Sequence, residues 1–220
     1  MKKMKVLYAE ALESICNTED VRAFAKAPFL IGDLAYATDG FLLARIKADK
    51  VIDSKEFRSE EDLDFSKVIP TEETGTIRIP LEDIKEAFKL GPQVELYDTK
   101  VTKEECETCE GKKKVTWQYD DYLEDFDCPV CKGVGSITTT EQVKNGKTGI
   151  DRTAYVLIGK SYFFTNLILK LIDVIEKVGG DEIKLISQPE LGGSLFHVKD
   201  LDIVLMPCIR PSDGEIVATY

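Results

Sequence analysis

The clearest pattern of apolar positions along the chain is helical and lies near its carboxyl end. Over residues 162–178, apolar side chains recur every three or four positions and define one broad apolar face, which two glycines close. A second, shorter apolar face over 81–90 follows a proline and ends at a Gly-Pro pair, so it predicts another helix. The weaker pattern over 6–27 predicts one or two short helical turns.

Extended apolar runs predict strands between these helices. The runs over 29–38 and 41–48 flank the turn-forming pair Asp39-Gly40, which favours a hairpin. The polar stretch over 49–75 predicts a surface excursion, and Asn145-Gly146 predicts a turn. Further strands are predicted over 76–80, 93–101, 136–143, 152–158, 182–187, 195–198 and 202–206.

The order strand, helix, strands recurs along the chain. It occurs over 76–143 and 152–207, and a looser version occupies 5–50. This repetition predicts an α+β fold in which antiparallel sheets place one face against helices. We expect three units over 1–75, 76–150 and 151–220, the second interrupted by an inserted arm over 104–136.

Four of the six cysteines lie in two copies of the motif CxxCxG. A CxxC turn lets both thiolates reach one ion, and the glycine permits the positive φ that such a turn needs. We therefore predict one structural zinc ion per chain, with no open position for catalysis. Two redox dithiols or a chance spacing are the alternatives. The predicted ligands are Cys106, Cys109, Cys128 and Cys131.

The motif is similar to the cysteine-rich zinc module of J-domain chaperones, which uses four such repeats where this chain has two. The resemblance implies a zinc hairpin and not a chaperone. Between the two motifs a basic run precedes aromatic residues, an arrangement suited to single-stranded nucleic acid. The candidate contacts are Lys112, Lys113, Lys114 and Trp117, and the acidic continuation favours a simple solvated hairpin instead.

Charge and composition narrow the possible functions. The net charge of −11 argues against a surface that coats nucleic acid, although a local basic strip remains compatible with it. His197 is the single histidine, so imidazole chemistry has little scope, and we expect a structural histidine and no enzyme. The acidic run over 60–64 is more typical of a solvated loop than of a magnesium site. Cys16 and Cys208 are expected to be buried apolar residues.

The chain is expected to be cytoplasmic and without a membrane partner. No stretch approaches the roughly 20 apolar residues that cross a bilayer, and no signal-type apolar run develops at the start.

The run YATDGFLLA over 36–44 resembles the ATDGHRLA segment of the bacterial beta sliding clamp, the ring that holds a replicative polymerase on DNA. Two later segments are similar to that family in the same order. IPLEDIKEAF over 79–88 is similar to its strand-proline-helix unit, and IVLMP over 203–207 is similar to its VVMP ending. The resemblance implies a clamp fold and a replication accessory or processivity factor, with double-stranded DNA and peptides of polymerases or other replication proteins as partners.

In that family the ATDG hairpin and the MP ending line an apolar pocket that receives a short partner peptide. Phe41 and Leu42 replace the family's histidine and arginine, which implies a more apolar and less discriminating pocket. Plain core packing between units is the alternative for these positions. The pocket residues that the resemblance implies are Thr38, Gly40, Phe41, Leu42, Leu43, Val204 and Met206.

The chain offers about three half-domain units where the bacterial protomer has six. Encircling DNA would therefore need three or more copies, so a homo-oligomer is expected. The two clearest predicted helices carry nearly balanced charge, which weakens the case for encirclement. A zinc-stabilised protein-interaction module with no DNA role is the alternative function.

Overall fold

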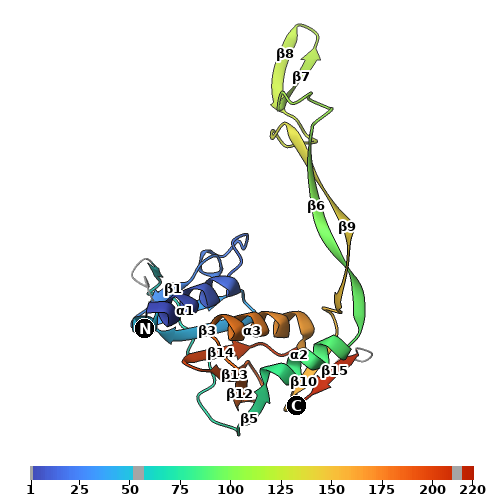
Figure 1. Cartoon of the computed structure of the whole chain (residues 1–220). Helices are drawn as coiled ribbons and strands as arrows, with labels where there is room; N and C mark the ends of the chain where they lie inside the picture. The colour runs from blue at the N-terminus through green and yellow to red at the C-terminus, as the bar shows by residue number, and fades with distance from the viewer. Residues whose placement is uncertain (1, 52–56, 210–214) are drawn as a thin grey trace. The chain divides into compact units, whose positions relative to one another are not determined.

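The computed structural model describes residues 2–51, 57–209 and 215–220, and it divides into two compact units (Figure 1). The first unit comprises residues 1–93 and 150–220, and the second comprises residues 94–149. The second unit is therefore an insertion in the chain of the first. The α+β class and the mostly antiparallel strands agree with the prediction.

An eight-stranded sheet forms the centre of the first unit, in the order β4-β1-β2-β3-β14-β13-β12-β5. Its strands are β1 (Phe29–Ile31), β2 (Leu34–Thr38), β3 (Leu42–Lys47), β4 (Arg58–Ser59), β5 (Ile77–Pro80), β12 (Glu182–Ser187), β13 (Ser194–Val198) and β14 (Leu201–Leu205). All neighbouring strands are antiparallel except β1 and β4. In the middle of the sheet, Leu43 lies opposite Val204, so the early hairpin pairs directly with a strand from the end of the chain.

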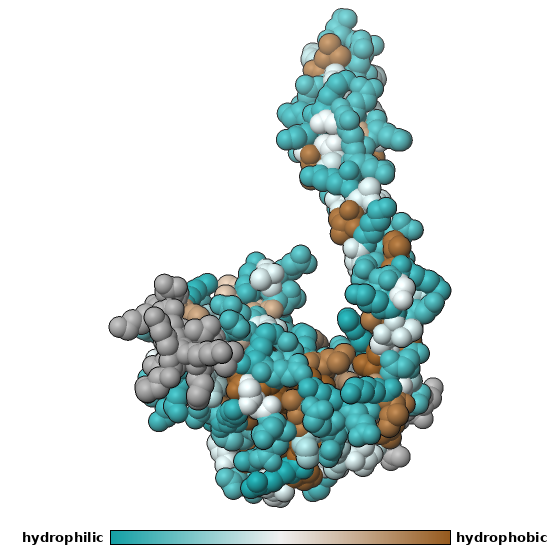
Figure 2. Space-filling model, viewed as in Figure 1, coloured by the Kyte–Doolittle hydropathy of each residue, from teal (hydrophilic) through white to brown (hydrophobic). Residues whose placement is uncertain are grey.

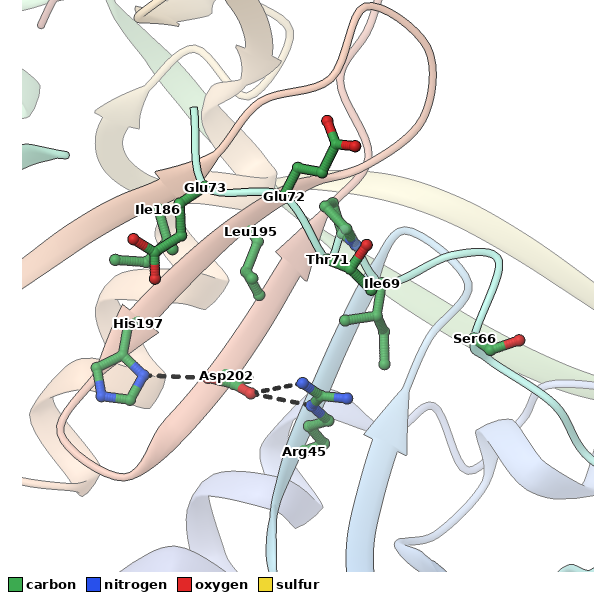
Figure 3. A pocket seen from close by; sticks show the side chains of 11 residues that line it. Arg45, Ser66, Ile69, Thr71, Glu72, Glu73, Ile186, Leu195, His197 and Asp202 are labelled. Carbon is green, nitrogen blue, oxygen red and sulfur yellow. Dashed lines mark hydrogen bonds and ion pairs between the residues drawn. The ribbon is translucent and has the colours of Figure 1, made fainter. Parts of the chain in front are cut away.

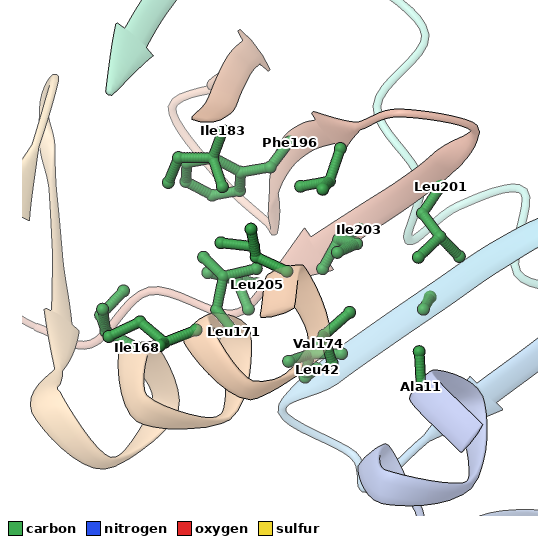
Figure 4. Close-up of a cluster of buried hydrophobic side chains, with 14 of the residues drawn as sticks. Ala11, Leu42, Ile168, Leu171, Val174, Ile183, Phe196, Leu201, Ile203 and Leu205 are labelled. Atoms are coloured by element: carbon green, nitrogen blue, oxygen red, sulfur yellow. The ribbon is translucent and has the colours of Figure 1, made fainter. Parts of the chain in front are cut away.

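Two helices cover one face of this sheet. Helix α1 (Lys2–Ile15) packs against α3 (Thr165–Lys177). Because side chains alternate along a strand, Leu42 and Leu205 point to this face, where both are fully buried (Figure 4). Leu171 of α3 is buried in the same cluster. The amphipathic pattern over 162–178 therefore forms the helical half of the core.

The other face of the sheet is also apolar, which the sequence did not indicate. Leu43 and Val204 point to this face and pack with Phe29 and Tyr36. Phe65 stacks on Tyr36, with 5.7 Å between ring centroids, and Ile69 is buried beside it. The prediction of a surface excursion over 49–75 is therefore wrong for this part, although 52–56 lie outside the described residues.

Smaller elements complete the first unit. Helix α2 (Leu81–Leu90) follows β5 as predicted and buries Leu81, Ile84 and Phe88. A three-stranded sheet has the order β11-β10-β15. These strands are β10 (Tyr155–Ile158), β11 (Ser161–Phe164) and β15 (Ile216–Thr219). Two short 3-10 helices of one turn each are η1 (Ala23–Ala25) and η2 (Ala48–Lys50).

The second unit consists of two antiparallel ribbons. Strand β6 (Gln93–Glu105) pairs with β9 (Ser136–Ile150), and β7 (Lys114–Tyr119) pairs with β8 (Tyr122–Asp127). The turn predicted at Asn145-Gly146 is wrong, since β9 continues through both residues and Gly146 takes a φ of +73° within the strand. Pairing with β6 overrides the local turn preference.

Two helical predictions also need correction. Residues 2–15 form one continuous helix of about four turns where short turns were predicted. Residues 162–164 belong to β11, so α3 begins only at Thr165. The division into units over 1–75, 76–150 and 151–220 stays a prediction.

Candidate functional site

The four predicted zinc ligands meet in one buried cluster in the second unit. The side chains of Cys106, Cys109, Cys128 and Cys131 are all buried, and their sulfurs lie within 4.8 Å of one another. The Sγ atoms of Cys106 and Cys128 are 3.8 Å apart, and those of Cys109 and Cys131 are 3.7 Å apart. Four sulfurs about 2.3 Å from a zinc ion form a tetrahedron with edges of about 3.8 Å. The spacing therefore fits a tetrahedral metal site.

The two CxxCxG turns hold the sulfurs through backbone geometry. Gly111 and Gly133 have φ values of +70° and +78°, as the motif requires. The Gly135 amide donates to the Cys131 sulfur at 3.2 Å. Burial raises the pKa of Cys131, but the bonds from the Gly135 amide and the neighbouring thiols outweigh burial and lower the pKa to about 7. Burial and the contact with the Cys131 sulfur raise the pKa of Cys109 to about 12, so within this pair the thiolate form is favoured at Cys131.

A zinc ion bound by the four cysteines would hold the two turns together as a structural ion. The four ligand positions would all be filled by protein, so no position would remain for water or substrate. Among residues 2–51, 57–209 and 215–220, no other cluster of histidine, cysteine, aspartate or glutamate has the spacing of a metal site.

The basic-then-aromatic run lies between the two cysteine pairs. Lys112 pairs with Glu110 at 2.7 Å, and Lys114 begins β7 opposite Asp127. Lys113 has a positive φ of +70°, and its carbonyl accepts a bond from the Cys128 amide. Trp117 is exposed on β7. Contact of these residues with nucleic acid stays a prediction.

All seven pocket residues that the family resemblance implies line one cavity of about 250 Å³ in the first unit. Phe41 is 67% exposed and Met206 is 38% exposed, so both side chains are accessible to solvent at the edge of the cavity. Leu42, by contrast, is fully buried in the core beneath the cavity. The residues that line this cavity are Thr38, Gly40, Phe41, Leu42, Leu43, Val204 and Met206, together with Arg22, Phe24, Phe65 and Val68.

A second cavity of about 500 Å³ shares Gly40, Phe41 and Met206 with the first. Its other walls come from Asp39 of the hairpin turn, from the last residue of β11, from α3 and from the segment after β14. The first cavity includes Leu43 and Val204, which face away from the helices, so the two cavities lie on either side of the strand ends. The further lining residues are Asp39, Phe164, Asn166, Leu167, Lys170, Pro207 and Cys208.

A network of polar bonds fixes the turn between the cavities. The buried carboxylate of Asp39 accepts bonds from the Phe41 and Leu42 amides, both at 2.9 Å, and pairs with the Lys170 ammonium. Gly40 has a φ of +94°, and an added Cβ would lie 2.7 Å from a guanidinium nitrogen of Arg22. Several bonds and the glycine conformation thus fix the backbone of this turn, and they place Phe41 at the rim of both cavities.

Sequence reasoning missed the aromatic wall and the two cations of this site. Phe24 and Phe65 reach the first cavity from segments with no clear periodic pattern. Arg22 donates to the Asp39 carbonyl at 3.0 Å and pairs with Asp20. A signal existed only for Lys170, whose place on the polar side of a predicted helix is visible in the sequence.

Three lysines on α2 and α3 form ion pairs, so a nearby carboxylate balances the charge of each. Lys85 pairs with both Glu82 and Glu176, and Lys177 pairs with Asp173. Lys170 pairs with Asp39 of the hairpin turn. The near-neutral balance predicted for these helices is therefore organised as specific ion pairs.

A larger, more polar cavity of about 660 Å³ lies on the sheet face away from the helices (Figure 3). Arg45, Asp202 and His197 lie in a row across β3, β14 and β13. Asp202 accepts bonds from Arg45 at 2.9 Å, and its other oxygen lies 3.1 Å from Nδ1 of His197. These charges are directed at one another, which agrees with a structural histidine.

The two remaining cysteines are half-buried. Burial raises the pKa of Cys16 to about 11, and it raises the pKa of Cys208 as well. Both thiols are therefore poor nucleophiles.

Within the described parts of the chain, no helix has the length and apolar character needed to span a membrane.

The arrangement of strands and helices is similar to that of bacterial DNA sliding clamps. A crystal structure of the DNA polymerase sliding clamp from Pseudomonas aeruginosa matches 95% of this chain at a TM-score of 0.50 and 14% identity. The Helicobacter pylori beta clamp in complex with 3,4-difluorobenzamide matches 94% at a TM-score of 0.50 and 10% identity. The chain covers 64% of each of those chains.

These likenesses define a protein with the sliding-clamp fold. No protein-family model matches the sequence, and no curated protein matches it. At 10–14% identity the shared property is the fold, so the chain is assigned to the fold and not to a family by descent.

Proposed function

We propose that this protein is a clamp-like accessory factor of DNA replication that holds short partner peptides in the two cavities around Phe41 and Met206. One observation carries the proposal. All seven residues that the family resemblance implies for the peptide pocket line one cavity, in a protein with the clamp fold. A concave apolar surface with a few buried anchors is typical of peptide recognition. The role needs no catalytic residue, and we assign none.

The cavities favour a peptide with two neighbouring apolar anchors. One anchor would enter beside Phe24 and Phe65, and the other beside Phe164 and Leu167. Phe41, exposed between them, would be covered by the bound segment. Arg22 and Lys170 border the two cavities and would tolerate an acidic residue in the partner.

A peptide-binding experiment tests this proposal. The probes are fluorescein-labelled peptides in which a leucine and a phenylalanine are separated by polar spacers of increasing length. We expect one spacing to bind best, and expect Phe41→Asp and Met206→Asp each to weaken binding about tenfold or more. Leu191→Asp is the matched control, because Leu191 is 91% exposed and lines neither cavity. Equal losses in all three variants, or no binding, would overturn the proposal.

The second part of the proposal is a role on DNA. Its alternative is an interaction module without DNA contact, which is favoured because lysines of α2 and α3 already pair with carboxylates. A labelled duplex separates the two, since phosphate contacts weaken steeply as salt rises. Binding at low salt that is lost at high salt supports a clamp on DNA. No binding at low salt supports the interaction module.

A ring around DNA requires self-association. Because the protomer spans only 64% of the similar clamp chains, we infer that three or more copies would be needed to close a ring. Sedimentation at tens of micromolar tests this, and a strict monomer there would exclude the ring while leaving the peptide site intact. We place the protein in the cytoplasm, where its replication partners would be found.

A further inference from the structure

The β7–β8 hairpin has one aromatic face and one polar face. In its register Val115 lies opposite Phe126, Trp117 opposite Glu124, and Tyr119 opposite Tyr122. Directly opposed residues of an antiparallel pair share a face, so these six side chains lie on one side of the ribbon. The opposite face carries Lys114, Thr116, Gln118, Leu123, Asp125 and Asp127.

The aromatic face is open to solvent. Trp117 is 71% exposed, Tyr119 is 78% exposed and Tyr122 is 81% exposed. Figure 2 shows a few hydrophobic residues in this unit among hydrophilic ones, on a hydropathy scale that does not count tryptophan and tyrosine as hydrophobic. Within residues 94–149, β7 and β8 pair only with each other, so no second layer of this unit covers the rings. Exposed aromatic side chains that gather on one face are typical of an interaction site.

The charge around the face is acidic. The hairpin from Lys114 to Asp127 has one lysine and five carboxylates, which are Asp120, Asp121, Glu124, Asp125 and Asp127. The single lysine points to the polar face, opposite Asp127, and the charged residue on the aromatic face is Glu124. This potential attracts a cationic partner and repels phosphate.

We propose that the aromatic face of the β7–β8 hairpin binds a basic segment of a partner protein, in which every second residue faces the hairpin and these facing residues include both arginines or lysines and apolar residues. A guanidinium group lies flat on the Trp117 ring and pairs with the Glu124 carboxylate, because these two residues are directly opposite on one face. Apolar side chains two and four positions away in the extended segment point to the same side as the arginine and contact Tyr119, Tyr122 and Phe126.

Stacked single-stranded nucleic acid fits the face less well. Such binding combines aromatic stacking with lysines that track the backbone on the same surface. Here Lys114 lies on the other face, and Lys112 is paired with Glu110 at 2.7 Å. Nucleic-acid binding is therefore the outcome that the experiment must separate from binding of the basic segment.

Trp117 is the only tryptophan in the chain, so intrinsic fluorescence of the full-length protein reports directly on this face. The probes are a peptide that spans the six residues of β7, with arginine, valine and arginine in turn at every second position and serine between them, its counterpart with glutamate for arginine, and an oligothymidylate. We expect a saturable change in Trp117 emission with the basic peptide only, weakened by added salt.

A matched pair of substitutions assigns the binding to the aromatic face. Glu124→Gln and Asp125→Asn each remove one carboxylate charge from adjacent residues that point to opposite faces. We expect Glu124→Gln to weaken peptide binding about fivefold and Asp125→Asn to have less than half that effect. A response to oligothymidylate without one to the basic peptide, equal effects of the two variants, or no response to any probe overturns the proposal. None of these results bears on the cavities around Phe41.

Discussion

The backbone N–H of Met206 donates a 2.9 Å hydrogen bond to the carbonyl oxygen of Phe41. This bond extends the pairing of β3 with β14 by one step beyond the strands and brings the two exposed rim residues together. The cavities on either side share both residues, so their shape depends on this contact. The site is thus built by a long-range strand pair and not by one local motif.

Asp39→Ala should destabilise the protein by about 2–4 kcal/mol. The Asp39 carboxylate is buried, and its removal leaves the Phe41 and Leu42 amides and the Lys170 ammonium without their partner. Urea unfolding measures the loss. Asp173→Ala is the control, because Asp173 is 49% exposed in its pair with Lys177 and should cost about 0.5 kcal/mol or less for the pair. Similar losses in both variants would show that the turn network adds nothing.

Chelation of the metal should release one zinc ion per chain and unfold residues 104–136, while residues 1–93 and 150–220 keep their structure. The reason is that four thiolates and a few backbone bonds hold the two cysteine turns, whereas the first unit has its own large core. Metal analysis gives the stoichiometry, and hydrogen exchange gives the region that opens. Freshly purified reduced protein without zinc would contradict the prediction, as would unchanged exchange over 104–136.

Gly135→Ala should weaken the zinc module far more than Gly146→Ala. Both glycines have positive φ, +85° and +73°, so both variants bear the left-handed backbone penalty of about 1–2 kcal/mol. An added Cβ at Gly135 would also lie 2.7 Å from the Gly111 carbonyl oxygen, while nothing lies within 4 Å at Gly146. A zinc competition assay with a chelating dye compares them. Equal affinities would show that the two turns do not approach closely.

The contact between Tyr8 and Asp200 should make stability depend on pH in the alkaline range. Burial and the 3.0 Å bond to the Asp200 carboxylate raise the pKa of Tyr8 from 10.0 to about 12. Because the folded protein favours protonated tyrosine, this contribution is complete below pH 10 and is lost as pH rises through 12. Wild type should therefore lose its stability advantage over Tyr8→Phe in that interval. A difference that stays constant with pH would refute the contact.

Much of the fold could be predicted because its signals are local and strong. Strand β12 begins and ends where its pattern predicts, and α2 follows Pro80 as the proline and its apolar face require. The spacing of the two CxxC turns was enough to predict that the four cysteines meet in one cluster, as they do. In each of these features, residues close together in the sequence determine the local structure.

The remaining features depend on contacts far apart in sequence. Helix α1 was underestimated because two of its buried positions are Ala11 and the amphipathic Tyr8, which give a weak apolar signal. The pair Asn145-Gly146 favours a turn when its sequence is considered alone, but pairing with β6 keeps β9 extended through both residues. Phe65 joins the second apolar face from an irregular segment with no periodicity, so its position follows only from the tertiary fold.

Photo-cross-linking tests the central claim, that the cavities around Phe41 and Met206 hold a partner peptide, most directly. The best-binding leucine–phenylalanine peptide would carry a benzophenone in place of its phenylalanine, and mass spectrometry would locate the attachment site on the full-length protein. The account predicts cross-links at Met206 and within 38–43, lost on competition with the unlabelled peptide. Cross-links that map outside the lining of both cavities would contradict it.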